Sequence, residues 1–184
     1  IVSGGGSALL CVDAVECEQG QRLYDSFLKT GKTISELNTI RKHISSLKGG
    51  GLAKVAYPAT VIGLIFSDVP GDHFSDVASG PTYKDTTTII DAERAITEYD
   101  LGDFSLVETP KEDKYFEKVH NFVLVSNKTA VEAMDKKAKE LGFEPNIIST
   151  ELYDEVDEAL HKIINTTPAS SHPSSVEEGK GVVI

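Results

Sequence analysis

The sequence predicts an α/β fold, with a mostly parallel sheet and helices on both faces in a Rossmann-like three-layer arrangement. Short apolar stretches alternate with amphipathic stretches along the 184 residues, and this alternation is typical of parallel sheets. The stretches 61–66 and 122–125 have the length and composition of strands buried on both faces. A chain of this length is ample for a sizeable core.

The composition is ordinary for a soluble globular protein and argues against several classes of function. Apolar residues make up 40% of the chain, and no run approaches the roughly 18 apolar residues of a membrane span. The net charge of −11 argues against general binding to nucleic acid or anionic membranes. Cys11 and Cys17 are too few for a disulfide framework or a zinc site. With no visible signal peptide, a cytoplasmic location is expected.

The N-terminal stretch predicts an anion site. Residues 1–3 resemble the end of a strand whose beginning is missing, and Gly4, Gly5, Gly6 and Ser7 follow it. Glycines between a strand and a helix allow successive backbone N–H groups to point at one anion. The spacing matches neither the Walker loop nor the G-x-G-x-x-G of dinucleotide folds. A tight turn that needs positive φ is the alternative, although three glycines exceed that need.

Two helices are expected next, at 19–30 and at 33–47. The second helix has a capping box at Thr33 and Glu36, repeats apolar residues on one side and is expected to end at the glycines 49–51. The scarce positive charge gathers there, on Arg41, Lys42, His43 and Lys48. Solvated cations near a helix C-terminus are the alternative, but in a chain this acidic the cluster favours anion binding.

The strand at 61–66 is followed by a long polar loop, which is rich in Asp, Ser, Pro and Gly up to Pro81. Ligands of open α/β sheets sit where loops leave the carboxyl ends of strands. The loop is therefore a candidate site, and a loop capped by its own Asp and Ser side chains is an equally weighted alternative.

The rest of the chain continues the alternation of helix and strand. The expected elements are a helix at 88–99, an irregular stretch at 101–119, a strand at 122–125, a helix at 129–141, a short strand at 146–149 and a helix at 153–164. The stretch 165–181 is rich in Ser, Pro, Thr and Gly and predicts a linker or mobile loop. Residues 182–184 resemble the start of a further strand.

Four separated motifs carry a resemblance to a known family. They are SGGGSALL at 3–10; NTIRKHIS at 38–45 with KGG at 48–50; SDVPGD at 67–72 with ASGPT at 78–82; and Ser126-Asn127. In this order and spacing they resemble the N-terminal domain of the class II glycerate 2-kinases, a family long labelled hydroxypyruvate reductase, whose second domain is called MOFRL. The resemblance runs from Ile1 to about Ser149.

The resemblance implies a kinase that uses ATP and Mg²⁺ to phosphorylate the 2-hydroxyl of D-glycerate, giving 2-phosphoglycerate. Residues 1–164 would form the N-terminal-type domain of a two-domain protein and supply half of an interdomain site, so the chain alone is expected to be inactive. The expected partners are glycerate and a nucleotide, with a homodimer left open and with no nucleic acid or membrane.

The implied site residues fall into two groups. Arg41, Lys42, Asp68 and Asp72 would be catalytic, with the two aspartates as metal ligand or base. Phosphate or the glycerate carboxylate would be bound by the remaining residues: Gly4, Gly5, Gly6, Ser7, Lys48, Ser79 and Asn127.

The chain departs from the family pattern in several places. CVDAVEC at 11–17 replaces a Pro-rich acidic stretch, and Gly51 stands where an Arg often follows the Lys-Gly-Gly. The family's upstream segment, with a Gly-Lys-Ala element, and its MOFRL domain are absent from the chain.

Three other interpretations stay open. An NAD(P)-dependent hydroxypyruvate reductase is disfavoured because no G-x-G-x-x-G with a following acid is present. A non-catalytic module would bind sugar phosphates or other small anions without turnover. A purely structural α/β domain would separate the cluster at 41–48 from the loop at 68–72.

Overall fold

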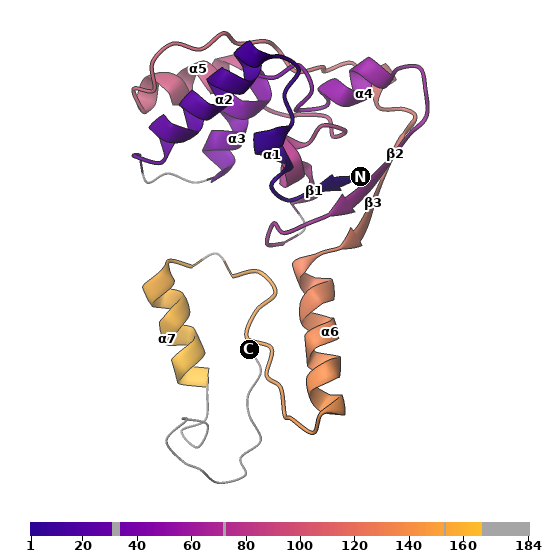
Figure 1. Ribbon diagram of the computed structural model, residues 1–184, viewed down its shortest axis with the longest axis vertical. Coiled ribbons are helices and arrows are strands. Elements are labelled where there is room, and N and C mark those ends of the chain that lie inside the picture. Colours follow the sequence, from indigo (N-terminus) through magenta and orange to yellow (C-terminus); the bar gives the residue numbers. More distant parts are fainter. Residues whose placement is uncertain (31–33, 72, 153, 167–184) are drawn as a thin grey trace. The chain divides into compact units, whose positions relative to one another are not determined.

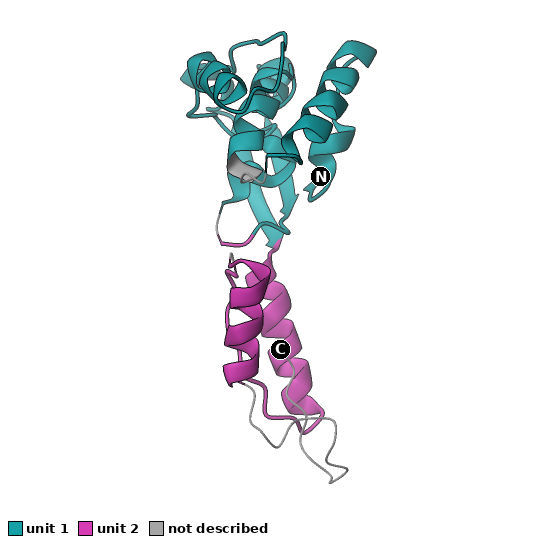
Figure 2. Ribbon diagram, turned by 90° about the vertical axis from the view of Figure 1, so that its left-hand side faces the viewer, with its two compact units in different colours: residues 1–69, 73–124 teal, residues 70–72, 125–184 magenta. Residues whose placement is uncertain are grey.

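The computed structural model describes residues 1–30, 34–71, 73–152 and 154–166 of the chain, in which strands alternate with helices (Figure 1). The chain divides into two compact units, which Figure 2 colours separately: residues 1–69 with 73–124, and residues 70–72 with 125–184. Within the described ranges, no helix is long and apolar enough to cross a membrane.

The first unit is built on a three-stranded sheet, in the order β1 (Val2–Ser3), β2 (Val61–Phe66) and β3 (Val119–Val125). The strands run in parallel (Figure 1), and Val2 of β1 lies opposite Ile65 of β2. This arrangement confirms the predicted α/β class and the strand at the N-terminus.

Helices of the first unit form its largest apolar core. They are α1 (Gly6–Leu9), α2 (Ala14–Phe27), α3 (Ile34–His43), α4 (Gly51–Ala56) and α5 (Ile89–Glu98), with 3-10 segments η1 (Phe74–Ser79) and η2 (Asp113–Tyr115). The buried core side chains come mainly from α2 and α3: Leu23, Phe27, Leu37, Ile40, Ile44 and Leu101. The apolar repeat of α3 therefore faces this core, as the sequence pattern predicts.

Hydrogen-bonding side chains set several helix boundaries. Asp13 accepts from the Glu16 backbone N–H at 2.8 Å and caps α2, so this helix begins before the predicted residue 19. Thr88 and Asp91 form a capping box at the start of α5, close to the predicted boundary. The predicted capping residue Thr33 lies outside the described residues.

The predicted end of α3 is wrong, because the helix stops at His43 rather than at the glycines. The Ser45 hydroxyl accepts from the backbone N–H groups of Leu47 and Lys48, both at 3.2 Å. This local bond offers the backbone an alternative to the helix. Gly51 begins α4, a helix that the sequence pattern did not predict.

The prediction that β2 and β3 are buried on both faces is also wrong. Gly63 and Ile65 of β2 are buried, but Ile62 is 63% exposed, and Phe122 of β3 is 52% exposed. Because side chains alternate across a strand, the buried residues share one face of β2 and the exposed ones the other. In the described part of the chain, that second face is apolar and accessible to solvent.

The second unit contains α6 (Asn127–Glu140) and α7 (Val156–Thr166). Residues 146–149 are irregular there, so the predicted short strand is wrong. They line an apolar cavity together with Val131 and Met134 of α6 and Ile163 of α7. Of the predicted linker and final strand, residues 167–184 lie outside the described residues.

The core supports a stability prediction with a matched control. Leu23→Ala should lower the free energy of unfolding by about 3 kcal/mol, since Leu23 is fully buried and truncation leaves a cavity. Leu28→Ala at the end of the same helix should change it by less than about 0.5 kcal/mol, because Leu28 is 63% exposed. Urea unfolding measures both, and equal losses would contradict this placement of the core.

Candidate functional site

The glycine-rich loop at the N-terminus lies directly against the polar loop that follows β2. A Cβ at Gly4 would stand 2.0 Å from Oδ2 of Asp68, and a Cβ at Gly6 would stand 2.9 Å from that of Ala78. Gly5 precedes α1 with a φ of 76°, so the tight-turn interpretation is correct for this residue. The other two glycines allow close approach, which brings the first and third motifs together.

Ser79 joins three of the motifs through its side chain. It is fully buried, and its hydroxyl donates to Oδ1 of Asn38 at 3.2 Å and lies 2.9 Å from Oγ of Ser7. Ala78, Ser79 and Gly80 have φ values of 52°, 59° and 62°. Such left-handed backbone is costly for a residue with a side chain and is retained where the surroundings fix it.

The Lys48-Gly49-Gly50 loop is fixed to the same segment through backbone atoms. The Gly49 N–H donates to the Ser79 carbonyl at 2.9 Å, and the Gly50 N–H donates to the Gly80 carbonyl at 2.8 Å. Gly50 has a φ of 89°, which favours glycine. The second motif is thus held in register with the third.

The first unit contains a cavity of about 380 Å³, whose lining includes residues of the first and second motifs. Ser7 lines it, as do four residues that matter chemically: Tyr24 and Glu16 of α2, Arg41 of α3 and Lys48 of the loop that follows. Two predicted cations therefore face one cavity, together with the end of the glycine-rich loop.

Arg41 is the cation of this cavity that lacks an acidic partner. Its guanidinium lies 5.9 Å from the centroid of the Tyr24 ring, and burial lowers its pKa. Among the residues that the structure describes, no carboxylate forms an ion pair with Arg41. A half-buried charge is costly unless it is paired, so an anion in the cavity would stabilise it.

The positive charge of Lys48 is already partly balanced by a neighbouring carboxylate. Its Nζ donates to the Leu10 carbonyl at 2.5 Å and lies 3.6 Å from Oε1 of Glu16. Burial, with a smaller contribution from Arg41, lowers the pKa of Lys48 and outweighs the opposing effect of Glu16. With Glu16 counted against Arg41 and Lys48, the cavity keeps an excess of positive charge.

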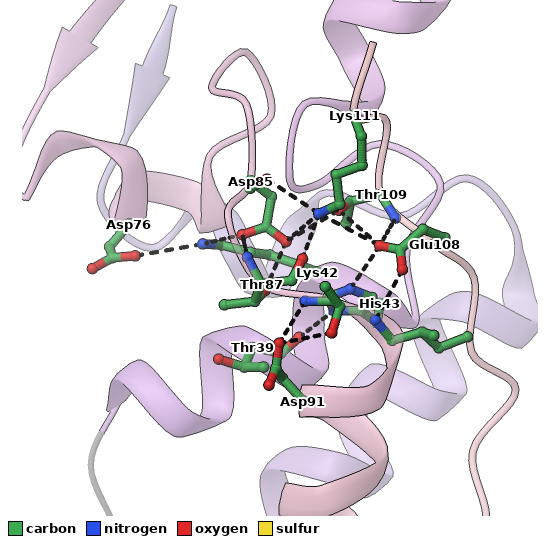
Figure 3. Close-up of polar contacts among 12 residues, drawn as sticks. Thr39, Lys42, His43, Asp76, Asp85, Thr87, Asp91, Glu108, Thr109 and Lys111 are labelled. Carbon is green, nitrogen blue, oxygen red and sulfur yellow. Dashed lines mark hydrogen bonds and ion pairs between the residues drawn. The ribbon is translucent and has the colours of Figure 1, made fainter.

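The predicted cluster of basic residues is divided in the structure, and Figure 3 shows the part that contains Lys42 and His43. Lys42 is absent from the cavity lining, and its Nζ lies 3.2 Å from Oδ1 of Asp85 and 3.8 Å from Oδ1 of Asp76. His43 is fully buried and pairs with Thr39 and Glu108. These two residues belong to a separate polar network, which we call the Asp85 network: Thr39, Lys42, His43, Asp76, Asp85, Thr87, Glu108, Thr109 and Lys111.

The acids of the Asp85 network were missed by the sequence analysis. Burial alone would raise the pKa of Asp85, but Lys42, Thr87 and Lys111 outweigh it and hold the pKa below its ordinary value of 3.8. The Lys-Asp-Thr-Thr order at 84–87 is a usable signal, because an Asp before Thr often accepts bonds from the local backbone.

The remaining predicted site residues are Asp68, Asp72 and Asn127, and neither Asp68 nor Asn127 lines the cavity. Asp68 packs on Gly4, Asp72 lies outside the described residues, and Asn127 is the first residue of α6 in the second unit. In the described ranges, no three His, Cys, Asp or Glu side chains form a group that could hold a metal. Mg²⁺ is commonly held by one or two carboxylates with substrate phosphates, so Asp68 still fits as a ligand.

Cys11 and Cys17 are joined in a disulfide, with their Cα atoms 5.5 Å apart. Both cysteines line the cavity. The sequence analysis weighed them only as a framework or a zinc site and did not consider a single bridge across the turn before α2.

The fold and the linked motifs define a parallel α/β domain of a recognised kind. The chain belongs to the family described as "Domain of unknown function (DUF4147)", whose model matches residues 1–109. A "Glycerate 2-kinase" of Pyrococcus horikoshii is 42% identical over 176 residues, covering 86% of this chain and 39% of the relative. These matches confirm the family resemblance inferred from the four motifs.

Two further matches agree with this assignment. A "Putative hydroxypyruvate reductase" of Agrobacterium vitis is 38% identical over 168 residues, covering 86% of this chain and 38% of the relative. A crystal structure of glycerate kinase from Thermotoga maritima has a TM-score of 0.67 and 37% identity, covering 80% of this chain and 37% of that one. The chain thus spans about two-fifths of the length of these relatives.

The contact between the first and third motifs predicts that one methyl group added at Gly4 lowers the stability of the fold. Gly4→Ala should lower the free energy of unfolding by about 2 kcal/mol, because the Asp68 carboxylate must move away. Gly20→Ala is the control, since nothing lies within 4 Å of a Cβ there and alanine favours the helix by about 1 kcal/mol. Denaturant midpoints that fall for both variants would contradict the packing described.

The Asp85 network predicts a pH dependence of stability. The pKa of Asp85 is lower in the folded state, so its stabilising effect is fully present above about pH 4 and is lost as the pH falls through the folded-state value. Asp85→Asn should cost about 3 kcal/mol at pH 7. The difference between the wild type and this variant should shrink below pH 4. Urea unfolding from pH 7 to pH 2 tests this, and a constant difference would refute it.

Proposed function

We propose that this chain is part of a glycerate 2-kinase, which transfers the γ-phosphoryl group of ATP to the 2-hydroxyl of D-glycerate. The carrying observation is Arg41, which has no acidic partner among the described residues and which lines a cavity together with residues of the first two motifs. The name of the Pyrococcus relative supports this reaction, and the name of the crystallised Thermotoga protein supports phosphorylation of glycerate.

The reaction breaks the bond between the γ-phosphorus and the oxygen of ADP, forms one to the glycerate oxygen and releases the hydroxyl proton. Such transfers depend on positioning and on charge stabilisation. Arg41 would bind the glycerate carboxylate or a phosphate, since its planar guanidinium suits both. Lys48 would bind the same anion while it keeps its ion pair with Glu16. Gly4, Gly5, Gly6 and Ser7 would supply backbone N–H and hydroxyl groups.

Asp68 would hold Mg²⁺ or orient the hydroxyl. Mg²⁺, when bound, supplies neutralisation of phosphate charge. Asp72 would share this role, and Asn127 would donate a hydrogen bond to a substrate. Ser79 would hold Ser7 in place, since its own hydroxyl donates to Asn38, and Lys42 would contribute positive charge from outside the cavity lining. Residues 1–164 would form one domain of a cytoplasmic two-domain enzyme, with a MOFRL domain supplying the other half of the site.

Hydroxypyruvate reduction is the second candidate, favoured by the name of the Agrobacterium relative. The absence of a G-x-G-x-x-G motif from the 184 residues counts against it.

ATP consumption by the complete protein with D-glycerate tests the proposal, with the product identified as 2- or 3-phosphoglycerate. Formation of 2-phosphoglycerate is expected. Arg41→Ala should lower kcat/KM by about 100-fold, because it removes a charged contact to the substrate. Arg94→Ala is the matched control and should leave turnover unchanged, since Arg94 lies on the surface of α5.

Other outcomes would assign the protein differently. NAD(P)H oxidation with hydroxypyruvate, without a phosphorylated product, would replace the kinase with the reductase. Phosphate binding without either turnover would indicate a non-catalytic module for small anions.

A further inference from the structure

The last turn of α3 carries Arg41, Lys42 and His43 in succession, and their side chains go to different places. Arg41 lines the cavity. Lys42 and His43 contact the segment 85–109 in the Asp85 network (Figure 3). Since successive residues of a helix point about 100° apart, fixing one of these side chains limits where the next can point.

Asp85 fixes Lys42 without being able to reach a ligand. Its side chain is 1% exposed and receives Nζ of Lys42 at 3.2 Å. Its other oxygen accepts from the hydroxyls of Thr87 at 2.7 Å and Thr109 at 3.1 Å. A buried carboxylate with its acceptor sites filled in this way acts only through the groups that it holds.

The position of Asp85 does not depend on Lys42 alone. Nζ of Lys111 lies 3.7 Å from Oδ2 of Asp85 and donates to the Asp85 carbonyl at 3.1 Å. Lys111 therefore balances the charge of Asp85. A variant that lacks the ammonium of Lys42 leaves Asp85 paired rather than buried and alone.

The neighbouring residue and the neighbouring loop strengthen this fixation. The His43 carbonyl accepts from the Val107 N–H at 2.7 Å, and Nε2 of His43 lies 3.2 Å from Oε1 of Glu108. A Cβ at Gly49 would stand 3.2 Å from that of Lys42, so the Lys42 stem also packs against the loop that carries Lys48. The network thus contacts both the turn that carries Arg41 and the loop that carries Lys48.

We propose that Asp85 is a positioning residue, which through Lys42 holds the last turn of α3 so that Arg41 faces the cavity. The proposal rests on the proposed function of that cavity. It gives Lys42 a supporting role in place of contact with the substrate.

Kinetics of the complete protein test the proposal with Asp85→Asn, Lys42→Met and Arg41→Ala, singly and with each of the first two combined with the third. Arg41→Ala should raise KM for either glycerate or ATP. Asp85→Asn and Lys42→Met should raise KM for the same substrate by about tenfold and leave the other KM unchanged. In the Arg41→Ala background, each should add less than about twofold.

The double variants also distinguish positioning from a purely structural role. If Asp85 positions Arg41, the loss of stability from Asp85→Asn should remain in the Arg41→Ala background, while the kinetic effect of Asp85→Asn disappears there. Asp113→Asn is the control for a carboxylate paired with lysine, since Asp113 is exposed and pairs with Lys84, and it should change neither KM. If Asp85→Asn does not fold, Lys42→Met carries the test, because Asp85 keeps Lys111 and both threonines.

The results separate two kinds of failure. Equal rises in both KM values, or an undiminished effect of Asp85→Asn or Lys42→Met in the Arg41→Ala background, would overturn the positioning role and leave the kinase proposal intact. No kinase turnover by the wild type, or an Arg41→Ala variant as active as the wild type, would overturn the proposed function of the cavity, and the positioning role with it.

Discussion

The buried hydroxyl of Ser79 is the constraint on which the arrangement of the first unit depends. It bonds Asn38 of α3 and contacts Ser7 of α1, and its own backbone receives the Gly49 N–H. The first and second motifs therefore meet the third at one residue. Because buried polar groups are costly when unpaired, few other arrangements of the segments around Ser79 are stable. The cavity beside them is therefore well defined in shape.

Local signals predicted most of the secondary structure. The helices expected at 88–99 and 129–141 are present as α5 and α6, with caps at Thr88 and Ser126 that the sequence analysis did not name. The apolar repeat of α3 identified its core face. The errors arose where a side chain overrode the pattern, as when Ser45 ended α3 early. The exposed face of β2 and β3 was not predictable, since the continuous apolar run of β2 is typical of strands that are covered on both faces.

The candidate site was predictable in its residue types but not in its geometry. The sequence placed Arg41, Lys42 and Lys48 in one cluster, yet Lys42 pairs with Asp85 while Arg41 and Lys48 line the cavity. Periodicity assigns faces to a helix, but it does not say which distant segment packs on each face. The partners of Lys42 and His43 lie many residues further along the chain, where one sequence gives no sign of the pairing.

The junction between the loop at 48–53 and the segment at 79–81 is made of backbone atoms. Carbonyls of Ser79, Gly80 and Pro81 receive the N–H groups of Gly49, Gly50 and Ala53. Backbone hydrogen bonds of this kind depend on the path of the main chain and not on which side chains are present. For loop grafting, the two segments therefore form one transferable unit: an exchange of either alone would mismatch donors and acceptors, whereas their joint exchange would preserve the junction across diverged sequences.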